Sequence, residues 1–417
     1  MLPNEEDEVL LAVAEQIPKF RGFLDSNNII NVLPVVQFLL CVEETVVREQ
    51  TIESMRELVL HFNEDQIQKE VVSLVMTISN QEYFTGKVSA CYLVRICYEK
   101  AGKEKEKLRS LYFKLCEDDT PLIKRSAAKE FGPLCLVMEK EVVNPDMINY
   151  FKKFMTDSDS VKVIALSSLI QLVKLFQNTD QQRLNVQVVV AASEDKSWRV
   201  RHELAKIFPQ LIDGFGSQIN ELVPTLGNLI KDSEMEVRLA ALEGVTQVIK
   251  TVNPEKVSIC IIPALMSLSN ESSFHVKSCI GECLGPIARS VGYTAFNAKL
   301  SGLLDSLMKD ENAEVRLGVT KSLFDIFLSS EGNLLSSIST ILGTLQKDTQ
   351  YRIRETVIEI LGKLGCNYGI DTFKSYIEPL FFNYLIDTVS SVREVGIKSL
   401  EVKFNFLNYF LNVDYYT

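Results

Sequence analysis

The sequence predicts an all-α protein built as a tandem array of antiparallel helix pairs, and three observations support this prediction. An acidic residue followed six positions later by Arg or Lys, as in Asp232 and Arg238, recurs about every 39 residues along the chain. A proline column keeps the same register, with Pro224 fourteen positions before Arg238. Between these columns the apolar residues have helical spacing. The chain is therefore interpreted as a repeat protein.

The residues that follow Val or Ile at this point of each repeat, called here the anchor column, define the register and are Arg or Lys in all but one repeat. They are Arg48, Ser89, Lys124, Lys162, Arg201, Arg238, Lys277, Arg316, Arg354 and Arg393. Six positions before the anchor stand the acids Asp118, Asp195, Asp232, Glu271, Asp310, Asp348 and Asp387. Fourteen positions before it stand Pro34, Pro224, Pro263 and Pro379. Three columns in one register favour tandem repetition over coincidence.

One repeat shows how the elements are predicted. The apolar residues between Glu221 and Ile230 have helical spacing, and a short polar turn follows at 231–234. A second helical stripe is formed by Val237, Ala241, Val245 and Val248. Neither helix can bury its stripe alone, so the helix pairs are expected to stack on one another.

The same helical spacing and columns, followed along the chain, predict a single array of repeats. The first repeat contributes only its second helix, from Val9 to Ile17. The predicted repeats are residues 1–25, 26–64, 65–101, 102–139, 140–178, 179–216, 217–255, 256–294, 295–332, 333–370 and 371–417.

Each column has a physical reason. A proline inside the first helix removes a hydrogen bond and bends the helix. The acid lies near the amino end of the second helix, where the helix dipole favours negative charge, whereas the anchor cation lies in the first turn, where the dipole disfavours it. The cation therefore needs an acidic partner. The sequence predicts an acid–base ladder, with the acid supplied by the same repeat or by the neighbouring one.

Composition limits the kinds of partner. The net charge of -11 argues against nucleic acid. The longest apolar stretch, residues 29–42, is interrupted by polar residues and is shorter than the ~20 apolar residues that cross a bilayer. Nine cysteines without a C-x-x-C pair predict buried, reduced thiols in an intracellular protein. The compartment is predicted to be the cytoplasm, with the nucleus as a second location.

No catalytic pattern is present in the sequence. The three histidines, His61, His202 and His275, lie outside catalytic spacing with Cys, Ser or Asp. The phosphate-binding and nucleophile motifs of common enzymes are missing. The sequence therefore predicts no enzyme, no cofactor, no metal site and no small-molecule substrate.

The position three before each anchor, called here the turn-tip column, carries the strongest functional signal. It is expected at the solvent-facing turn and should be polar, yet five of its members are large and apolar or Pro: Pro121, Trp198, Met235, Phe274 and Tyr351. Trp198 and Tyr351 are each followed by arginine, a combination typical of interface hot spots. The column predicts a docking edge for proteins. In the alternative interpretation, these side chains fold back onto the next repeat.

The period and the columns resemble HEAT repeats, in which Pro is followed eight positions later by Asp and then by Val-Arg. This resemblance implies a right-handed or irregular superhelix of about eleven helix pairs. More specifically, several segments resemble the scaffold (A, 65 kDa regulatory) subunit of protein phosphatase 2A. They are DEVLLAVAEQ at 7–16, VEETVVR at 42–48, CEDDTP at 116–121, EDKSWRVR at 194–201, EVRL at 314–317 and YRIR at 351–354.

The resemblance implies a non-catalytic scaffold with two kinds of partner. Regulatory (B-type) subunits would contact Glu43, Glu44, Tyr83, Phe84, Asp119, Thr120, Pro121, Arg125, Lys196, Ser197, Trp198, Arg199 and Glu236. The catalytic subunit, which in this family is a metal-dependent Ser/Thr phosphatase, would contact Tyr351 and Arg352. Tyr351 stands where the family usually has Trp.

The alignment with the family is partial, which leaves alternatives open. The chain is expected to lack the first repeat and the last three repeats of the family's fifteen. One alternative is therefore a truncated scaffold that binds regulatory subunits as a decoy. Another is a HEAT-repeat transport adaptor, which would bind cargo peptides instead of a phosphatase.

Overall fold

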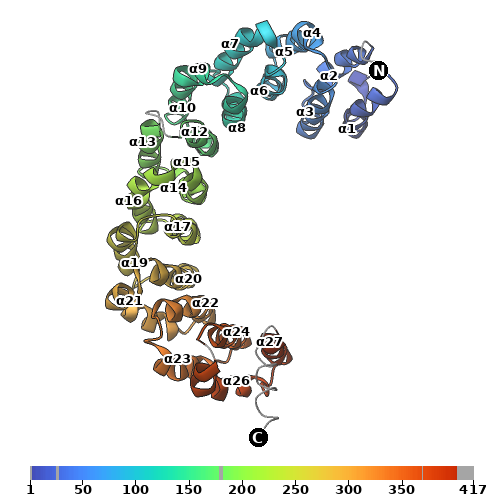
Figure 1. Cartoon of the computed structure of the whole chain (residues 1–417). Coiled ribbons are helices and arrows are strands. Elements are labelled where there is room, and N and C mark those ends of the chain that lie inside the picture. The colour runs from blue at the N-terminus through green and yellow to red at the C-terminus, as the bar shows by residue number, and fades with distance from the viewer. Residues whose placement is uncertain (1, 25–27, 178–181, 369, 402–417) are drawn as a thin grey trace. The chain divides into compact units, whose positions relative to one another are not determined.

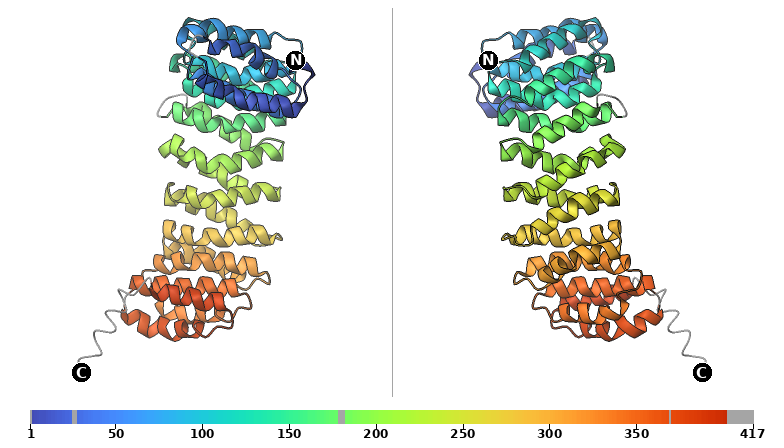
Figure 2. Two further views of the ribbon diagram at one scale, coloured as in Figure 1. Left: turned by 90° about the vertical axis from the view of Figure 1, so that its right-hand side faces the viewer. Right: turned by 90° about the vertical axis from the view of Figure 1, so that its left-hand side faces the viewer.

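The computed structural model describes residues 2–24, 28–177, 182–368 and 370–401, and these residues form helices and turns without a strand. The chain divides into two compact units, described separately here. The N-terminal block contains residues up to Ala192 together with Asp213–Phe215, and the C-terminal block contains Ser193–Ile212 and the residues from Gly216 onward. Within each block, antiparallel helix pairs stack side by side (Figures 1 and 2). The all-α prediction is confirmed.

The N-terminal block has two layers of helices. The second helices of its repeats are α1 (Asp7–Gln16), α3 (Thr45–Val59), α6 (Phe84–Tyr98), α8 (Pro121–Val137), and α11 (Asp159–Ser167) continued by α12 (Leu169–Leu175). The first helices are α2 (Leu33–Leu39), α4 (Glu64–Gln66) with α5 (Val72–Ser79), α7 (Lys105–Cys116), α9 (Lys140–Val142) with α10 (Ile148–Phe154), and α13 (Gln182–Ser193). Consecutive second helices pack directly on one another: α1 on α3, α3 on α6, α6 on α8, and α8 on α11.

The C-terminal block repeats this arrangement. Its second helices are α14 (Trp198–Ile207), α17 (Met235–Ile249), α20 (Phe274–Val291), α22 (Ala313–Ser329), α24 (Tyr351–Tyr368) and α27 (Ser390–Glu401). Its first helices are α16 (Ile219–Ile230), α18 (Pro254–Lys256) with α19 (Ile262–Ser267), α21 (Tyr293–Met308), α23 (Ile338–Leu345), and α25 (Ile370–Thr372) with α26 (Glu378–Tyr384). Each second helix again packs on the next, from α14 through to α27. The short helix α15 (Ile212–Phe215) lies at the boundary between the blocks.

The predicted stripes form the core of each repeat. In the repeat that contains α16 and α17, Leu222, Leu226 and Ile230 of α16 are at most 1% exposed. The second-helix stripe from Val237 to Val248 is buried to the same degree. Because each stripe is covered by its own partner helix and by the neighbouring pairs, burial depends on stacking.

The proline column lies in the first helices, as predicted. Pro224 is inside α16, and Pro34, Pro263 and Pro379 are near the amino ends of α2, α19 and α26. Directly before α19 and α26 the chain forms π-helical turns, at Val257–Ile261 and Phe373–Ile377. A π-helical turn interrupts the regular α-helical hydrogen-bond pattern, so in these two helices the irregular turn lies directly before the column proline.

The prediction for the cysteines is wrong in part. Cys91, Cys97, Cys116, Cys135 and Cys283 are buried, whereas Cys366, in α24, is exposed. All nine cysteines are free thiols. The predicted division of residues 1–417 into eleven repeats of one array stays a prediction, and residues 402–417 of its last repeat lie outside the described part of the chain.

Candidate protein-binding turns

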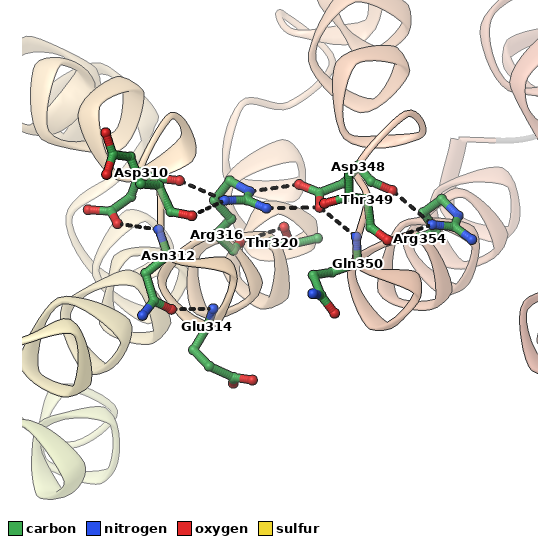
Figure 3. Close-up of polar contacts among 10 residues, drawn as sticks. Asp310, Asn312, Glu314, Arg316, Thr320, Asp348, Thr349, Gln350 and Arg354 are labelled. Atoms are coloured by element: carbon green, nitrogen blue, oxygen red, sulfur yellow. Dashed lines mark hydrogen bonds and ion pairs between the residues drawn. The ribbon is translucent and has the colours of Figure 1, made fainter.

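The acid–base ladder is present, and its geometry decides between the two expected sources of the acid. The Nε and Nη2 atoms of Arg316 donate to the two carboxylate oxygens of Asp348, in the next repeat, over 2.7 and 2.9 Å (Figure 3). Its Nη1 atom donates to the carbonyls of Asp310 and Glu311, in its own turn, over 2.7 and 3.0 Å. The acid of this rung therefore comes from the neighbouring repeat, and Arg316 binds two turns at once.

The same contact recurs along the C-terminal block. Arg201 makes a bidentate contact with Asp232, and Arg354 makes one with Asp387. The remaining rungs are single contacts, in which Arg238 lies 3.0 Å from Glu271 and Lys277 lies 2.9 Å from Asp310. In the bidentate rungs, both side chains are at most 16% exposed, so these ion pairs are largely shielded from water.

The ladder acids also shape the turns. One carboxylate oxygen accepts a hydrogen bond from the backbone N–H two residues later, as Asp348 does from Gln350 over 2.9 Å. The hydrogen bonds from Arg354 lower the pKa of the Asp387 carboxyl, although burial opposes this shift. The same hydrogen bonds raise the pKa of Arg354. The Arg354–Asp387 rung is therefore charged on both sides at neutral pH.

The N-terminal block contains a modified ladder. Lys124 lies 2.8 Å from Asp157, which stands five positions before the next anchor, Lys162, and so lies outside the predicted acid column. In the repeat whose anchor is Ser89, the anchor column fails to supply a cation, and Lys87 pairs with Asp118 over 2.9 Å instead. Ser89 donates to the carbonyl of Leu40 over 2.7 Å. Lys87 lies two residues before the anchor column, so the columns do not predict this rung.

The ladder places the turns of consecutive repeats side by side within each block. It also corrects the predicted position of the turn-tip column. Every turn-tip residue except Gly86 is the first residue of a second helix, because the helix begins three residues before the anchor. Gly86 is buried inside α6, which begins two residues earlier, at Phe84.

Most of the apolar turn tips face solvent. The exposed fractions are 37% for Met235, 39% for Phe274 and 38% for Tyr351. Pro121 is also exposed, whereas Trp198 is half-buried. The alternative in which these side chains fold back onto the next repeat is therefore wrong for the four exposed residues.

The residues predicted for regulatory subunits occupy three neighbouring turns in the N-terminal block. Tyr83 is 73% exposed and Phe84 is 44% exposed, at the start of α6. Thr85 donates to the carbonyl of Cys41 over 2.8 Å, which joins this turn to the one that carries Glu43 and Glu44. The Lys87–Asp118 rung joins it to the third turn, which carries Asp119, Thr120 and Pro121. Arg125 follows on α8, with a buried Nε that has no hydrogen-bond partner among the described residues.

The remaining predicted residues lie in the C-terminal block. Lys196 and Arg199 are exposed and flank Ser197 and Trp198 at the start of α14. The guanidinium carbon of Arg199 lies 5.0 Å from the centroid of the Trp198 ring, within cation–π range. The Arg201–Asp232 rung brings this turn next to the one that carries exposed Glu236.

Tyr351 and Arg352, predicted for the catalytic subunit, begin α24. Arg352 is exposed and lies 3.9 Å from Glu314 of the preceding repeat. Two further turns, at 271–274 and 310–313, separate Tyr351 from the turn of Glu236. The structure therefore brings Trp198 and Glu236 together and keeps both apart from Tyr351.

Within the described ranges, no cluster of three or more His, Cys, Asp or Glu side chains could hold a metal ion. In the same part of the chain, every helix is too short or too polar to cross a membrane.

Comparison with known proteins shows which proteins this chain resembles. It is 31% identical over 328 residues to the A-beta isoform of the serine/threonine-protein phosphatase 2A 65 kDa regulatory subunit of Homo sapiens, covering 76% of this chain and 55% of the relative. It is 32% identical to the regulatory A-type subunit of protein phosphatase PP2A of Saccharomyces cerevisiae, covering 53% of this chain and 37% of the relative. The protein phosphatase 2A scaffold subunit of Dictyostelium discoideum is 33% identical over 36% of this chain and 26% of its own length.

Two further comparisons concern the fold. A family model described as PIK3R4-like, middle domain, matches residues 217–400. Yeast importin-β (Kap95p) is similar in structure, with a TM-score of 0.64 and 13% identity over 94% of this chain and 53% of that one. Kap121p bound to RanGTP has a TM-score of 0.66 and 13% identity over 98% of this chain and 46% of that one. At such low identity these structures support the HEAT-repeat solenoid fold and nothing beyond it.

The relatives are named as regulatory or scaffold subunits, which confirms the expectation that the chain is not an enzyme. The chain spans about half the length of the human relative it matches. By fold and sequence it is a HEAT-repeat relative of the 65 kDa regulatory A-type subunits of protein phosphatase 2A.

Proposed function

We propose that the chain is a non-catalytic scaffold for a Ser/Thr protein phosphatase 2A complex. Regulatory (B-type) subunits bind the turns that carry Tyr83, Pro121 and Trp198, and the catalytic subunit binds the turn that carries Tyr351. The observation that carries this proposal is the turn at 194–199. It contains the start of the segment EDKSWRVR, and it presents Trp198 beside Arg199 at the surface. Tryptophan and arginine are among the residues most enriched in interface hot spots.

The scaffold acts by raising local concentration. Tethering two partners on one chain gives them an effective concentration in the mM range for a short connection. The scaffold therefore needs no chemistry of its own. Its described residues need only hold neighbouring turns of one block side by side, which is the role of the ladder.

Mixing the purified chain with the catalytic and regulatory subunits of phosphatase 2A, separately and together, tests the proposal. Size-exclusion chromatography with light scattering would detect a three-part complex, which is the expected result. Capture of only the regulatory subunit would favour the decoy alternative. Capture of neither partner would contradict the proposed function and leave the fold intact.

A point variant tests the turn itself. Trp198→Ala is expected to weaken regulatory-subunit binding by about 2 kcal/mol, the usual loss at a hot spot, as measured by titration calorimetry. Asp159→Ala is the matched control, because Asp159 is also the first residue of a second helix and the resemblance assigns it no contact. Unchanged affinity in Trp198→Ala, with helical content retained, would remove Trp198 from the interface.

A further inference from the structure

Two exposed apolar side chains have no role in the proposed function. Met235 and Phe274 are the first residues of α17 and α20, and each is more than a third exposed. The corresponding residues in the N-terminal block include Thr45 and Asp159, which are exposed and polar. The fold therefore accepts a polar residue at this position, and folding does not explain Met235 and Phe274.

The two side chains lie on neighbouring turns. The Arg238–Glu271 rung joins the turn of Met235 to the turn of Phe274. The Lys277–Asp310 rung then joins the turn of Phe274 to the turn that begins with Ala313. The ring of Phe274 contacts that of the following His275, with 3.9 Å between centroids. We name Met235, Glu236, Phe274, His275, Ala313 and Glu314 the middle strip.

Charge distinguishes the middle strip from the turns on either side of it. From the turn of Trp198 to the turn of Tyr351, the residues that follow the turn tips are Arg199, Glu236, His275, Glu314 and Arg352. Arginine thus accompanies the aromatic tips Trp198 and Tyr351, whereas the exposed carboxylates of Glu236 and Glu314 flank Phe274 one repeat away in both directions. Glu234 and Glu311 add exposed carboxylates to the same two turns. The Glu314 carboxylate also lies 3.9 Å from Arg352, but both side chains are more than half exposed, so this ion pair leaves Glu314 open to a partner. The ladder acids do not contribute to this charge, because Asp232, Glu271 and Asp310 are paired with ladder cations.

Spacing indicates the shape of the partner. Packed helices lie about 8–10 Å apart, which sets the separation of neighbouring turn tips because α17 packs on α20. Seven residues of an α-helix span about 10.5 Å, at a rise of about 1.5 Å per residue. A partner helix lying along the turns would therefore place apolar residues seven apart on Met235 and Phe274. Its basic residues would reach Glu236 and Glu314, about two repeat spacings apart.

We propose that the middle strip binds a basic amphipathic helix of a partner protein. This site goes beyond the proposed function, because it lies between the turns assigned to regulatory and catalytic subunits and shares only Glu236 with them. Apolar burial on Met235 and Phe274 supplies affinity, and the carboxylates select against acidic helices.

A designed peptide tests the proposal on the full chain. The probe is a labelled 21-residue helix with leucine at every seventh position and lysine beside each leucine. Its first comparison peptide has every lysine replaced by glutamate, and its second has leucine at every fifth position. Fluorescence anisotropy is expected to show at least tenfold tighter binding of the probe than of either comparison peptide. Equal binding of the lysine and glutamate peptides would overturn the proposal.

Variants locate the binding. Phe274→Ser is expected to weaken probe binding at least tenfold, whereas Phe23→Ser, which removes another exposed phenylalanine, leaves it unchanged. The charge variant E236K/E314K is expected to abolish the preference for lysine over glutamate. Trp198→Ala should not alter probe binding, so failure of the proposed phosphatase scaffold and failure of this site are distinguishable. If Phe274→Ser leaves probe binding unchanged, or converts a dimer seen by light scattering into a monomer, the proposal is overturned.

Discussion

Each ladder arginine that makes a bidentate contact fixes the shape of its own turn and the position of the next turn. Arg201 donates to the carbonyl of Asp195, in the turn that presents Trp198, and to the carboxylate of Asp232, in the following turn. The guanidinium group suits this role because its five donors lie in a rigid plane. A lysine, as at Lys277, offers a single charged nitrogen and makes a simpler rung.

The rung between Arg201 and Asp232 should contribute measurably to stability. Asp232→Ala leaves the guanidinium of a side chain that is only 14% exposed without its acidic partner, so we expect a loss of about 2–4 kcal/mol in the free energy of unfolding. Trp198, the single tryptophan, lies three residues from Arg201 and reports local unfolding in urea by its fluorescence. Asp305→Ala, at an exposed position of α21, is the control.

A double-mutant cycle separates the rung from other effects of the substitution. Arg201→Ala and Asp232→Ala should together cost less than the sum of their single effects. Additive losses would show that the pair does not interact in solution.

Between elements, small residues set how closely the second helices approach. A Cβ atom added to Gly281, in α20, would lie 2.7 Å from the backbone nitrogen of Val319, in α22. Ser322 of α22 donates to the carbonyl of Gly281 over 2.7 Å, which is possible only at this close approach. Glycine is therefore required at this crossing for space rather than for backbone freedom.

Gly281→Ala is expected to destabilise the C-terminal block by about 1–3 kcal/mol, because the added methyl group forces α20 and α22 apart. Gly302→Ala is the matched control. It also lies inside a helix, α21, but a Cβ there would have open space around it, so the substitution should stabilise by about 0.5–1 kcal/mol. Denaturant midpoints that shift in the same direction for both variants would contradict this account.

At the scale of the whole molecule, stability depends on a series of similar, local contacts. Each helix pair packs on its neighbours, so the free energy of each block is close to a sum of repeat and interface contributions. The ladder adds one ion pair at many of these interfaces. A change in conditions that weakens all of the rungs together should therefore have a larger effect than any single substitution.

Acid supplies such a change. The carboxyls of Asp118, Asp157, Asp232, Asp310, Asp348 and Asp387 all have lowered pKa values in the folded chain. The unfolded chain, in which an aspartate has a pKa of about 3.9, then binds more protons than the folded one at acidic pH. Stability from the ladder is therefore fully present above about pH 4 and is lost as the pH falls below this value through the folded-state pKa values. Denaturant titrations from neutral pH down to about pH 3 measure the loss.

The variant Asp387→Asn checks the assignment of this acid sensitivity. It removes one titrating rung, so it should lower stability at neutral pH and flatten the dependence on pH below about pH 4. An unaltered slope would mean that the ladder is not the source of the acid sensitivity.

Much of this molecule follows from the sequence alone, because a repeat protein is determined mainly by local patterns. The stripe from Val237 to Val248 predicted a buried helix face, and the columns around Asp232 and Arg238 predicted a turn and a ladder. Each of these features depends on residues that lie within one repeat or in two adjacent repeats. The family resemblance likewise rested on short contiguous segments such as EDKSWRVR.

The tertiary structure alone decided the points that depend on contacts between repeats. The sequence left open whether the ladder acid comes from the same repeat, and stacking settled this by bringing Asp348 to Arg316. The columns missed Lys87, which lies two residues before the anchor position and pairs with Asp118 from a helix, α6, that starts at Phe84. Exposure of Met235 and Phe274 was likewise undecided until the packing of α17 and α20 showed which side of each helix start remains uncovered. Local periodicity specifies each helix, whereas the contacts between helices depend on distances that only the folded chain defines.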